Sequence, residues 1–377
     1  MRTEAPIPAD ALAAIRQPLL DAGAARVEAP ILQPLSLLLD LAGEAMRARL
    51  FVVQAEGGAE ACLRPDFTVA VARQHVEGGA RDGRYYYEGP AFRASQGADL
   101  AEEFLQLGLE RFDAAGAEPV EADAEVAALA WRAAAAGGRT DLSLWLGDVA
   151  LFAAFVETLA LPQALAARLQ RVAGRPRLLH AELARAGEQA GPAPRGKLAA
   201  LLAGLSEGEA ASLLEEVWSL AGVEPVGGRG PAEIAARLVR RAEAADAPAL
   251  TESQARAIRE FMAISDAPET GLARVRALAG GRAGGLARAL EAWTRRLDRL
   301  RTLAPGATLG FAPALGHAFD YYDGLTFEVR SQALGAERPV AVGGRYDGLL
   351  ARLGGAAGAR AVGCMVRPAR AFAGGEA

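Results

Sequence analysis

The spacing of apolar and polar residues predicts a mixture of helices and strands in the front third of the chain. Apolar side chains recur at helical spacing from residue 8 to 22, and Gly23 stands where that helix would end. Two short β-prone runs, residues 50–54 and 61–64, flank a Gly-Gly pair and predict a hairpin. The run from Asp66 to Thr68 then opens another helix. Further strands are predicted at residues 26–29, 84–88, 103–111 and 141–146.

The pattern changes at residue 150 and again at residue 300. Between these positions Ala, Leu, Arg and Glu follow a helical period, interrupted by turns that contain Gly and Pro. We therefore expect an α+β fold with antiparallel strand pairing, in which residues 1–150 and 301–377 form a discontinuous core and residues 151–300 form a mainly helical insertion. The β-prone runs of the last part are residues 309–312, 321–330, 338–342 and 360–366.

Composition and charge exclude several classes of protein. Hydrophobic residues make up 51% of the 377 residues and charged residues 23%, which is ordinary globular usage. The formal net charge of -5 argues against the positive field that nucleic-acid binding needs. Two cysteines and three histidines are too few for a disulfide framework or a zinc cluster, and no apolar run is long enough to cross a membrane. We expect a cytoplasmic protein without a bound metal.

Taken one at a time, the candidate motifs are weak. Residues 343–348, Gly-Gly-Arg-Tyr-Asp-Gly, lack the spacing of a phosphate loop and predict a β-to-α turn in which the glycines have positive φ. Asp320 precedes Tyr321 and Tyr322, a group that suits either a bound cationic amine or a half-buried tyrosine pair. Arg93 is suited to clamping a carboxylate, although a surface ion pair is the commoner role of a lone arginine.

Read together, five segments resemble the catalytic core of the class II histidyl-tRNA synthetases in both order and spacing. The resemblance implies a six-stranded antiparallel sheet flanked by helices. It also implies a dimer formed through the amino-terminal helix and strand, because Pro30 matches the proline of that family's dimer-forming motif. The matching segments are residues 63–68 (Leu-Arg-Pro-Asp-Phe-Thr), 87–93, 103–110, 320–328 and 343–349.

The same resemblance implies a pocket for histidine. In that family, residues at the matching positions surround the amino acid. Glu110 and Tyr322 would meet the imidazole, Gln106 and Asp66 the ammonium group, and Arg93 the carboxylate. The complete predicted ligand-binding set is Asp66, Thr68, Arg93, Gln106, Glu110, Asp320, Tyr321 and Tyr322.

Departures from the synthetase pattern argue against adenylation chemistry. Ser95 stands where the family has the glutamate that serves adenine, and Glu102 makes acidic a loop in which the family carries arginine, so a triphosphate would meet charge of the wrong sign. His317 takes the place of the catalytic arginine and cannot supply a fixed bidentate charge. Arg370 keeps the place of the ATP-binding arginine, but Arg367 intrudes in the strand that precedes it. We also expect no anticodon-reading domain.

A synthetase-like core with a histidine site but without adenylation chemistry resembles the regulatory subunits of ATP phosphoribosyltransferase. The resemblance implies a chain with no catalytic residues and no cofactor, which the short-form catalytic subunit requires for activity in the first step of histidine biosynthesis. Histidine would act as the feedback effector, through a coupling free energy of about 1–3 kcal/mol between the two subunits. The chain would form a homodimer within a hetero-oligomer, with no tRNA and no membrane as partners.

Two other functions stay open at this point. A truncated synthetase paralogue would still activate an amino acid with ATP and transfer it to an acceptor other than tRNA, and Arg370 and residues 343–348 favour that alternative. A tRNA-binding accessory protein would need a basic surface, which the net charge of -5 does not favour.

Overall fold

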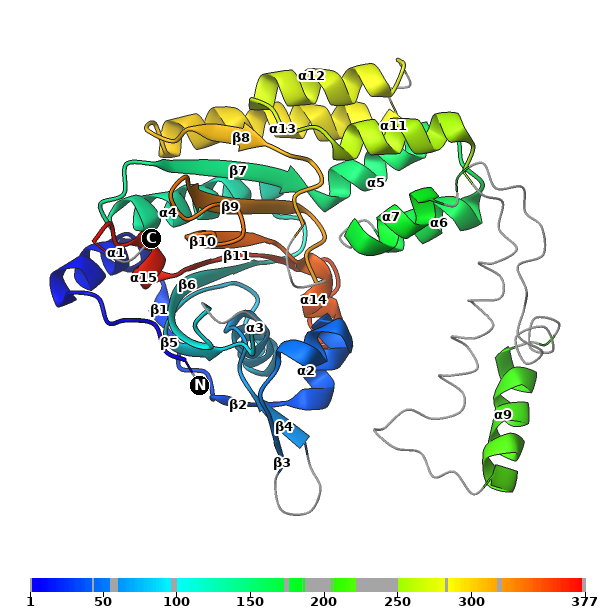
Figure 1. The fold of residues 1–377 in the computed structure, drawn as a ribbon, viewed down its shortest axis with the longest axis horizontal. Helices are drawn as coiled ribbons and strands as arrows, with labels where there is room; N and C mark the ends of the chain where they lie inside the picture. Colours follow the sequence, from blue (N-terminus) through cyan, green and yellow to red (C-terminus); the bar gives the residue numbers. More distant parts are fainter. Residues whose placement is uncertain are drawn as a thin grey trace. The chain divides into compact units, whose positions relative to one another are not determined.

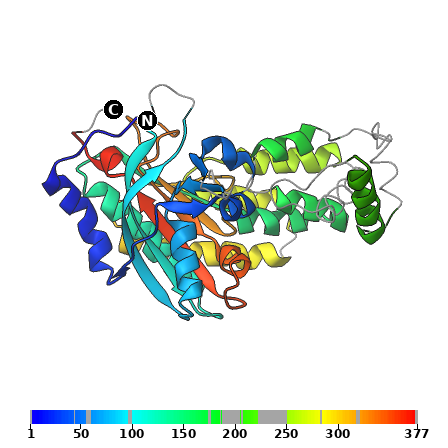
Figure 2. The same cartoon turned by 90° about the horizontal axis from the view of Figure 1, so that it is seen from below.

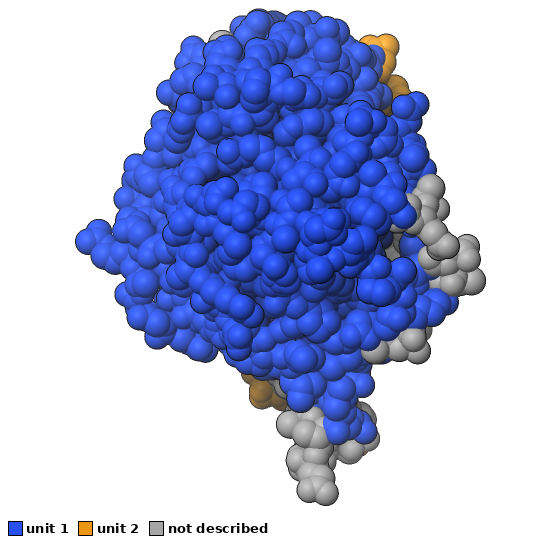
Figure 3. Space-filling model, turned by 90° about the vertical axis from the view of Figure 1, so that its left-hand side faces the viewer, with its two compact units in different colours: residues 1–158, 260–377 blue, residues 159–259 orange. Residues whose placement is uncertain are grey.

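The computed structural model divides the chain into two compact units, coloured separately in Figure 3. The first comprises Met1–Thr158 and Glu260–Ala377, and the second comprises Leu159–Arg259. The sequence pattern predicts a helical segment from residue 151 to 300, and the second unit is shorter than that segment. The residues that the structure describes are 2–42, 44–54, 60–95, 100–172, 176–184, 186, 205, 207–221, 250–281, 284–316 and 321–374.

Eight strands of the described residues form one sheet in the first unit. They are β1 (Ala25–Arg26), β5 (Gly83–Phe92), β6 (Glu103–Asp113), β7 (Leu142–Asp148), β8 (Leu309–Phe311), β9 (Leu325–Ser331), β10 (Ala341–Arg345) and β11 (Arg360–Val366). Their order is β1-β5-β6-β11-β10-β9-β7-β8, and the pairs from β5 to β7 are antiparallel, whereas β1 and β8 are parallel edge strands. The expected six-stranded antiparallel sheet is therefore the centre of a wider sheet (Figure 1).

A smaller sheet contains the predicted hairpin. Its strands in the described part are β2 (Leu32–Pro34), β4 (Glu60–Leu63) and β3 (Val52–Gln54), in that order. β3 and β4 pair antiparallel, with Val53 opposite Ala61, so the hairpin prediction is confirmed. Cys62 of β4 is completely buried, whereas Leu32 of β2 and Val52 of β3 are exposed.

Helices cover the main sheet, and their sequences explain how closely they approach it. α4 packs along β6, β9, β10 and β11, and α13 packs on α4 (Figures 1 and 2). Most of the buried residues of α4 are alanines, and such small side chains let a helix lie close to a sheet and to a second helix. The helices of this unit are α1 (Ala9–Asp21), α2 (Leu35–Ala42), the 3-10 helix η1 (Glu44–Arg49), α3 (Thr68–Glu77), α4 (Pro119–Ala135), α5 (Val149–Thr158), α12 (Pro268–Leu278), α13 (Gly284–Leu303), α14 (Asp347–Arg352) and α15 (Pro368–Ala371).

The second unit is helical in its described part. Its helices are α6 (Gln163–Arg171), α7 (Pro176–Ala184), α9 (Glu207–Ala221) and the first part of α11 (Glu252–Met262). Leu165 and Leu169 of α6 are buried, and so are Leu179 and Leu183 of α7. This spacing of four residues places each leucine pair on one face of its helix, as the helical period of the sequence indicates.

A buried ion network joins the main sheet to the helices behind it. Asp123 of α4 is completely buried. Its carboxylate lies 2.7 Å from a guanidinium nitrogen of Arg296 in α13 and 2.7 Å from one of Arg345 in β10. A buried carboxylate needs such partners, because an unpaired buried charge is strongly destabilising. The network therefore holds α4, α13 and β10 in one arrangement.

Residues 343–348 connect a strand to a helix as predicted, because β10 ends at Arg345 and α14 begins at Asp347, but their glycines do not have the predicted positive φ. Gly343 and Gly344 lie inside β10, and they are absent from the glycines with positive φ in the described part of the chain. Close packing requires glycine there instead, because a Cβ on Gly343 would lie 2.3 Å from the carbonyl oxygen of Gly363, and one on Gly344 would lie 2.4 Å from that of Leu325. The prediction of positive φ is wrong because a sequence does not distinguish a conformational need for glycine from a steric one.

Candidate functional site

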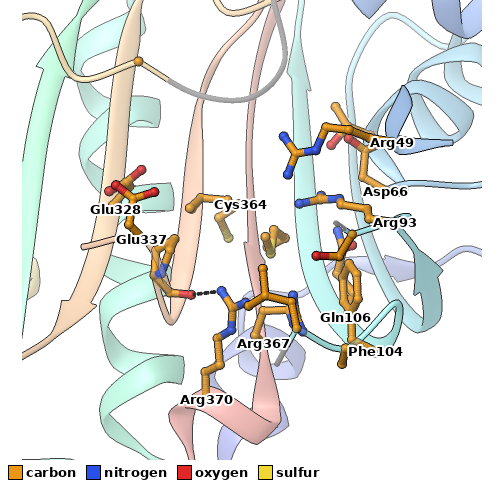
Figure 4. A pocket seen from close by; sticks show the side chains of 18 of the residues that line it. Arg49, Asp66, Arg93, Phe104, Gln106, Glu328, Glu337, Cys364, Arg367 and Arg370 are labelled. Atoms are coloured by element: carbon orange, nitrogen blue, oxygen red, sulfur yellow. Dashed lines mark hydrogen bonds between the residues drawn. The ribbon is translucent and has the colours of Figure 1, made fainter. Parts of the chain in front are cut away.

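A cavity of about 520 Å³ opens on the face of the main sheet in the first unit. Strands β6, β9, β10 and β11 contribute to its floor, and the segment before α3 and the end of β5 form one side. Figure 4 shows Asp66 and Arg93 on that side and Glu328 and Glu337 across from them. Six of the eight predicted ligand-binding residues line this cavity: Asp66, Thr68, Arg93, Gln106, Tyr321 and Tyr322.

Two buried oxygens in the cavity suit an ammonium group. Oδ1 of Asp66 and Oε1 of Gln106 have no hydrogen-bond partner among the described residues. The other oxygen of Asp66 accepts a hydrogen bond from the hydroxyl of Tyr321 at 3.1 Å, and the amide nitrogen of Gln106 donates to the hydroxyl of Tyr87 at 3.4 Å. Burial raises the pKa of Asp66, and the nearby charge of Arg93 opposes that shift. A cation with several N–H donors would satisfy both acceptors.

Arg93 follows β5 and places a positive charge beside these acceptors. Its Nε donates to the carbonyl oxygen of Pro65 at 2.8 Å, and its guanidinium carbon lies 5.4 Å from the centre of the Phe104 ring. Burial lowers the pKa of Arg93, and the Asp66 carboxylate opposes the shift. The bond to Pro65 and the aromatic ring fix the direction of the planar fork, which points toward the cavity in Figure 4. Such a group suits a carboxylate.

Glu110 lies beneath the cavity rather than in its wall. Its carboxylate accepts a hydrogen bond from Oγ1 of Thr68 at 2.7 Å and another from the hydroxyl of Tyr346. It also fills the space over Gly363, because a Cβ on that glycine would lie 1.6 Å from Oε2 of Glu110. Burial raises the pKa of Glu110 to about 8, although the bonds from Tyr346 and Thr68 oppose the shift. Thr68 and Gly363 both line the cavity, so the carboxyl group is one layer away from a ligand.

Tyr321 and Tyr322 form the next part of the cavity wall. Their ring centres are 4.8 Å apart and the rings are tilted by 45°. Both rings also meet Tyr346 edge-on, with centre distances of 5.7 Å for Tyr321 and 6.3 Å for Tyr322. Asp320 and His317, which the sequence also singled out, lie outside the described residues.

The structure corrects the predicted distribution of charge. Glu102 does not line the cavity, and its carboxylate lies 3.2 Å from a guanidinium nitrogen of Arg2. Three arginines that the predicted histidine pocket left out line the cavity: Arg49, Arg367 and Arg370. Glu102 itself therefore adds no negative charge to the cavity wall, because an arginine from the start of the chain pairs with it; Asp99, the other acidic residue of that loop, lies outside the described residues.

Sequence reasoning gave Arg367 no part in the cavity, although its position directly after the β-prone run of residues 360–366 could have indicated one. It directly follows β11, and its guanidinium carbon lies 3.5 Å from the centre of the Phe104 ring. A guanidinium nitrogen of the same side chain pairs with the carboxylate of Glu4. Burial lowers its pKa to about 9, and the charge of Arg370 adds to that shift. Arg49 carries no such signal, because it is the last residue of η1 and lies outside the matching segments.

Two general expectations can be examined in the described part of the chain. No group of three or more His, Cys, Asp or Glu side chains is arranged there as a metal site. Among the helices described, none combines the length and the apolar character that a membrane span requires.

Comparison with known proteins gives the family. A family model described as histidyl-tRNA synthetase matches residues 4–227 and 232–370. Curated relatives include proteins named ATP phosphoribosyltransferase regulatory subunit from two bacteria. The one from Brucella anthropi is 35% identical over 334 residues, and the one from Mesorhizobium japonicum is 36% identical over 337 residues; in both cases the match covers 87% of each chain.

Solved structures share the fold. One described as an ATP phosphoribosyltransferase regulatory subunit/histidyl-tRNA synthetase, from Bacillus halodurans, has a TM-score of 0.64 at 20% identity and covers 96% of this chain and 77% of its own. A histidyl-tRNA synthetase from a Nostoc species has a TM-score of 0.59 at 15% identity and covers 96% of this chain and 69% of its own. The α+β fold is thus that of the class II histidyl-tRNA synthetases, as predicted.

Within this class, the chain belongs to the family of ATP phosphoribosyltransferase regulatory subunits. Its role is therefore regulatory and lies in histidine biosynthesis. The names of the relatives describe a regulatory subunit of a transferase and not its catalytic subunit, which agrees with the expectation from the sequence.

Proposed function

We propose that this chain activates the short-form catalytic subunit of ATP phosphoribosyltransferase and transmits feedback inhibition by histidine. The observation that carries the proposal is the pair of unsatisfied acceptors, Asp66 Oδ1 and Gln106 Oε1, in the same cavity as the Arg93 guanidinium. An amino acid brings an ammonium group and a carboxylate, and this pair of charges matches the acceptor oxygens and the guanidinium group that lie together on one side of the cavity. The names of the curated relatives support the assignment to the transferase.

We propose that Tyr322 meets the side chain directly and that Glu110, one layer beneath the cavity wall, acts on it through Thr68. Glu110 has a pKa raised to about 8 by burial, so it exchanges a proton in the pH range in which an imidazole also titrates. An imidazole near the floor of the cavity would approach Thr68, which already bonds to Glu110. Asp320 and Tyr321 complete the proposed set of ligand-binding residues, the second through its bond to Asp66.

Feedback inhibition requires that histidine distinguish two states of the complex. A ligand with equal affinity for both states shifts nothing, however tightly it binds. Histidine must therefore bind this chain more tightly in the inhibited arrangement than in the active one. A coupling free energy of about 1–3 kcal/mol corresponds to a change in affinity of about 5- to 150-fold.

We further propose that the chain forms a homodimer within a hetero-oligomer located in the cytoplasm. The smaller sheet supports the first part, because Ile31, Leu32, Val52 and Val53 each expose between 37% and 53% of their surface. Exposed apolar side chains at the two outer strands of such a small sheet are typical of a surface that another chain covers.

A second candidate function keeps a catalytic role for the chain. The cavity lining includes Arg49, Arg367 and Arg370, and such a group of guanidinium ions favours a phosphate-bearing ligand. The chain would then activate an amino acid with ATP and transfer it to an acceptor other than tRNA. Amino-acid-dependent exchange of pyrophosphate into ATP measures this activity directly, and detectable exchange would contradict the regulatory proposal.

The experiment that tests the main proposal is a transferase assay. Phosphoribosyl transfer from phosphoribosyl pyrophosphate to ATP is measured for a short-form catalytic subunit, with and without this chain and with and without histidine. We expect activity that depends on this chain and falls when histidine is added. Activity that is independent of the chain would remove the proposed partner, and activity that depends on the chain but ignores histidine would remove the proposed effector.

A further inference from the structure

Residues 321–324 carry Tyr321 and Tyr322 of the cavity wall, and Asp323 in this segment both donates and accepts hydrogen bonds. The backbone N–H of Asp323 donates to the carbonyl oxygen of Arg345 at 3.0 Å. In the opposite direction, the Asp323 carboxylate accepts hydrogen bonds from the backbone N–H of Asp347 at 3.1 Å and from that of Gly348 at 2.6 Å. Residues 321–324 are thereby attached to the end of β10 and the start of α14.

The receiving side of this attachment is rigid. Arg345 donates from Nε to the Asp123 carboxylate at 2.8 Å and from Nη1 to Asp347 at 2.8 Å, and its side chain is almost completely buried. Its methylene groups pack against Gly324, where a Cβ would lie 3.0 Å from Cδ of Arg345. The ion network behind the sheet therefore fixes the point to which Asp323 is bound.

The position of this segment decides where the tyrosine rings stand. The ring of Tyr322 packs against β10 at Gly344, because a Cβ on Gly344 would be 2.8 Å from its Cδ1. Tyr321 reaches Asp66 with its hydroxyl, at 3.1 Å. Both rings belong to the cavity wall, whereas the Asp323 side chain is outside the cavity lining. The residues that touch a ligand and the residue that anchors them are thus different.

We propose that Asp323 is a positioning residue of the amino-acid site, whose carboxylate fixes Tyr322, and with it Tyr321, by binding the backbone of Asp347 and Gly348. The proposal rests on the function proposed above. It also gives residues 343–348 a role, because this glycine-containing run holds residues 321–324 in place and is not a phosphate-binding loop. Small changes in how such a segment is held are expected to alter affinity, because a binding site needs its contacting groups fixed within a fraction of an ångström.

A purely structural role is the competing explanation. Asp323 satisfies two N–H groups at the start of α14, as a helix cap does, and loss of a cap lowers stability without affecting a distant ligand. Glu118 provides a matched control, because its carboxylate accepts a hydrogen bond from the backbone N–H of Val120 at the start of α4 and it lies outside the cavity lining. Glu118→Ala therefore removes a cap but leaves the tyrosine segment untouched.

The test measures binding of histidine by calorimetry to the full chain and to its variants. We expect Asp323→Ala to weaken binding about tenfold, Asp323→Asn, which keeps one acceptor oxygen, to weaken it less, and Glu118→Ala to leave it unchanged. In a Tyr322→Ala background, Asp323→Ala should have a smaller effect than in the wild type, because only Tyr321 is then left for it to position. A cap that is only structural would not produce this non-additivity.

The outcomes separate the two proposals. If the wild-type chain binds histidine and Asp323→Ala binds it equally well, or if the losses from Asp323→Ala and Tyr322→Ala simply add, the positioning role is overturned while the proposed function stands. If the wild-type chain binds no histidine, the proposed histidine site fails and the positioning role fails with it. Thermal unfolding of each variant identifies one that does not fold, and Asp323→Asn then carries the comparison with Tyr322→Ala.

Discussion

Thr68 and Glu110 are 42 positions apart in the sequence, yet the hydroxyl of Thr68 donates to the carboxylate of Glu110 at 2.7 Å. The bond links the first residue of α3 to the middle of β6 and places a buried acid directly beneath the cavity. Two hydroxyl donors, Thr68 and Tyr346, and the bare Cα of Gly363 surround that acid. The cavity floor is thus built around one carboxyl group whose protonation depends on the folded structure.

The first prediction concerns the stability of the protein as a function of pH. The pKa of Glu110 is raised to about 8 from its ordinary value of 4.5, so the folded state binds a proton more tightly than the unfolded state. Between these two pH values the free energy of unfolding should therefore fall as the pH rises, by at most about 1.4 kcal/mol per pH unit for one proton, and it should level off above about pH 8. Urea denaturation at several pH values measures this slope.

Glu110→Gln is the control for that measurement. The amide keeps the shape of the side chain and an acceptor oxygen but does not titrate. The difference in slope between the wild type and Glu110→Gln isolates this residue from every other titrating group. Equal slopes in the two proteins would show that Glu110 is ionised in the folded state at neutral pH.

The second prediction concerns Arg93. Arg93→Ala removes the proposed carboxylate clamp and should weaken inhibition by histidine about 10- to 100-fold, because hydrogen bonds to charged groups contribute about 1.5–3 kcal/mol. Tyr322→Ala should relieve inhibition as well. Assembly with the catalytic subunit should be unchanged in both variants, as measured by size-exclusion chromatography.

Arg93→Lys is the control for the Arg93 prediction: it keeps the charge but loses the planar fork, so we expect an intermediate effect on inhibition. Loss of assembly with retained histidine binding would show that these residues serve the interface instead.

The third prediction concerns Gly363 in the cavity floor. A Cβ at this position would lie 1.6 Å from Oε2 of Glu110, so Gly363→Ala must displace the carboxylate that Thr68 and Tyr346 hold. We expect a loss of about 1–3 kcal/mol in the free energy of unfolding, which is typical of overpacking. Gly306→Ala is the matched control, because nothing lies within 4 Å of a Cβ at that position. A Gly363→Ala variant as stable as Gly306→Ala would mean that the floor is more plastic than the structure indicates.

The fourth prediction concerns the network behind the sheet. Asp123→Ala leaves the buried guanidinium groups of Arg296 and Arg345 without their shared carboxylate and should cost about 3–5 kcal/mol. Glu121→Ala, on the same helix, breaks a 2.6 Å pair with Arg299 that is about half exposed, and should cost about 0–1 kcal/mol. Chemical denaturation of the two variants gives the comparison, and equal losses would argue against a special contribution from the buried network.

Much of the fold follows from local patterns in the sequence. The period of apolar residues indicates α1 and the strands β5, β6 and β11, and the Gly-Gly pair indicates the hairpin of β3 and β4. These features depend on residues that are close together in the chain, which is why a sequence reveals them. The parallel edge strands β1 and β8 are short, and their pairing with β5 and β7 is a property of distant segments.

Some residues of the candidate site could likewise be predicted from the sequence, and others could not. Asp66, Arg93 and Gln106 lie in segments whose order and spacing match a known family, and the structure brings them to one cavity. Arg49 could not be assigned to it, because that residue lines the cavity only through the path of the backbone around it. Glu102 looked like part of a negative wall because its neighbours in sequence are acidic, whereas its actual partner is Arg2, 100 positions away.

The sequence by itself determined the class of fold, the family and the six residues that line the cavity where they were expected, because these depend on local periodicity and on ordered motifs. Only the tertiary structure decided why residues 343–348 contain glycine, which charges face the cavity, and how Asp323 holds the tyrosine segment. Each of these depends on the distance between atoms far apart in the chain, such as those of Gly344 and Tyr322 or of Asp123 and Arg345. Such distances are set by the packing of sheet and helices, which no local pattern contains.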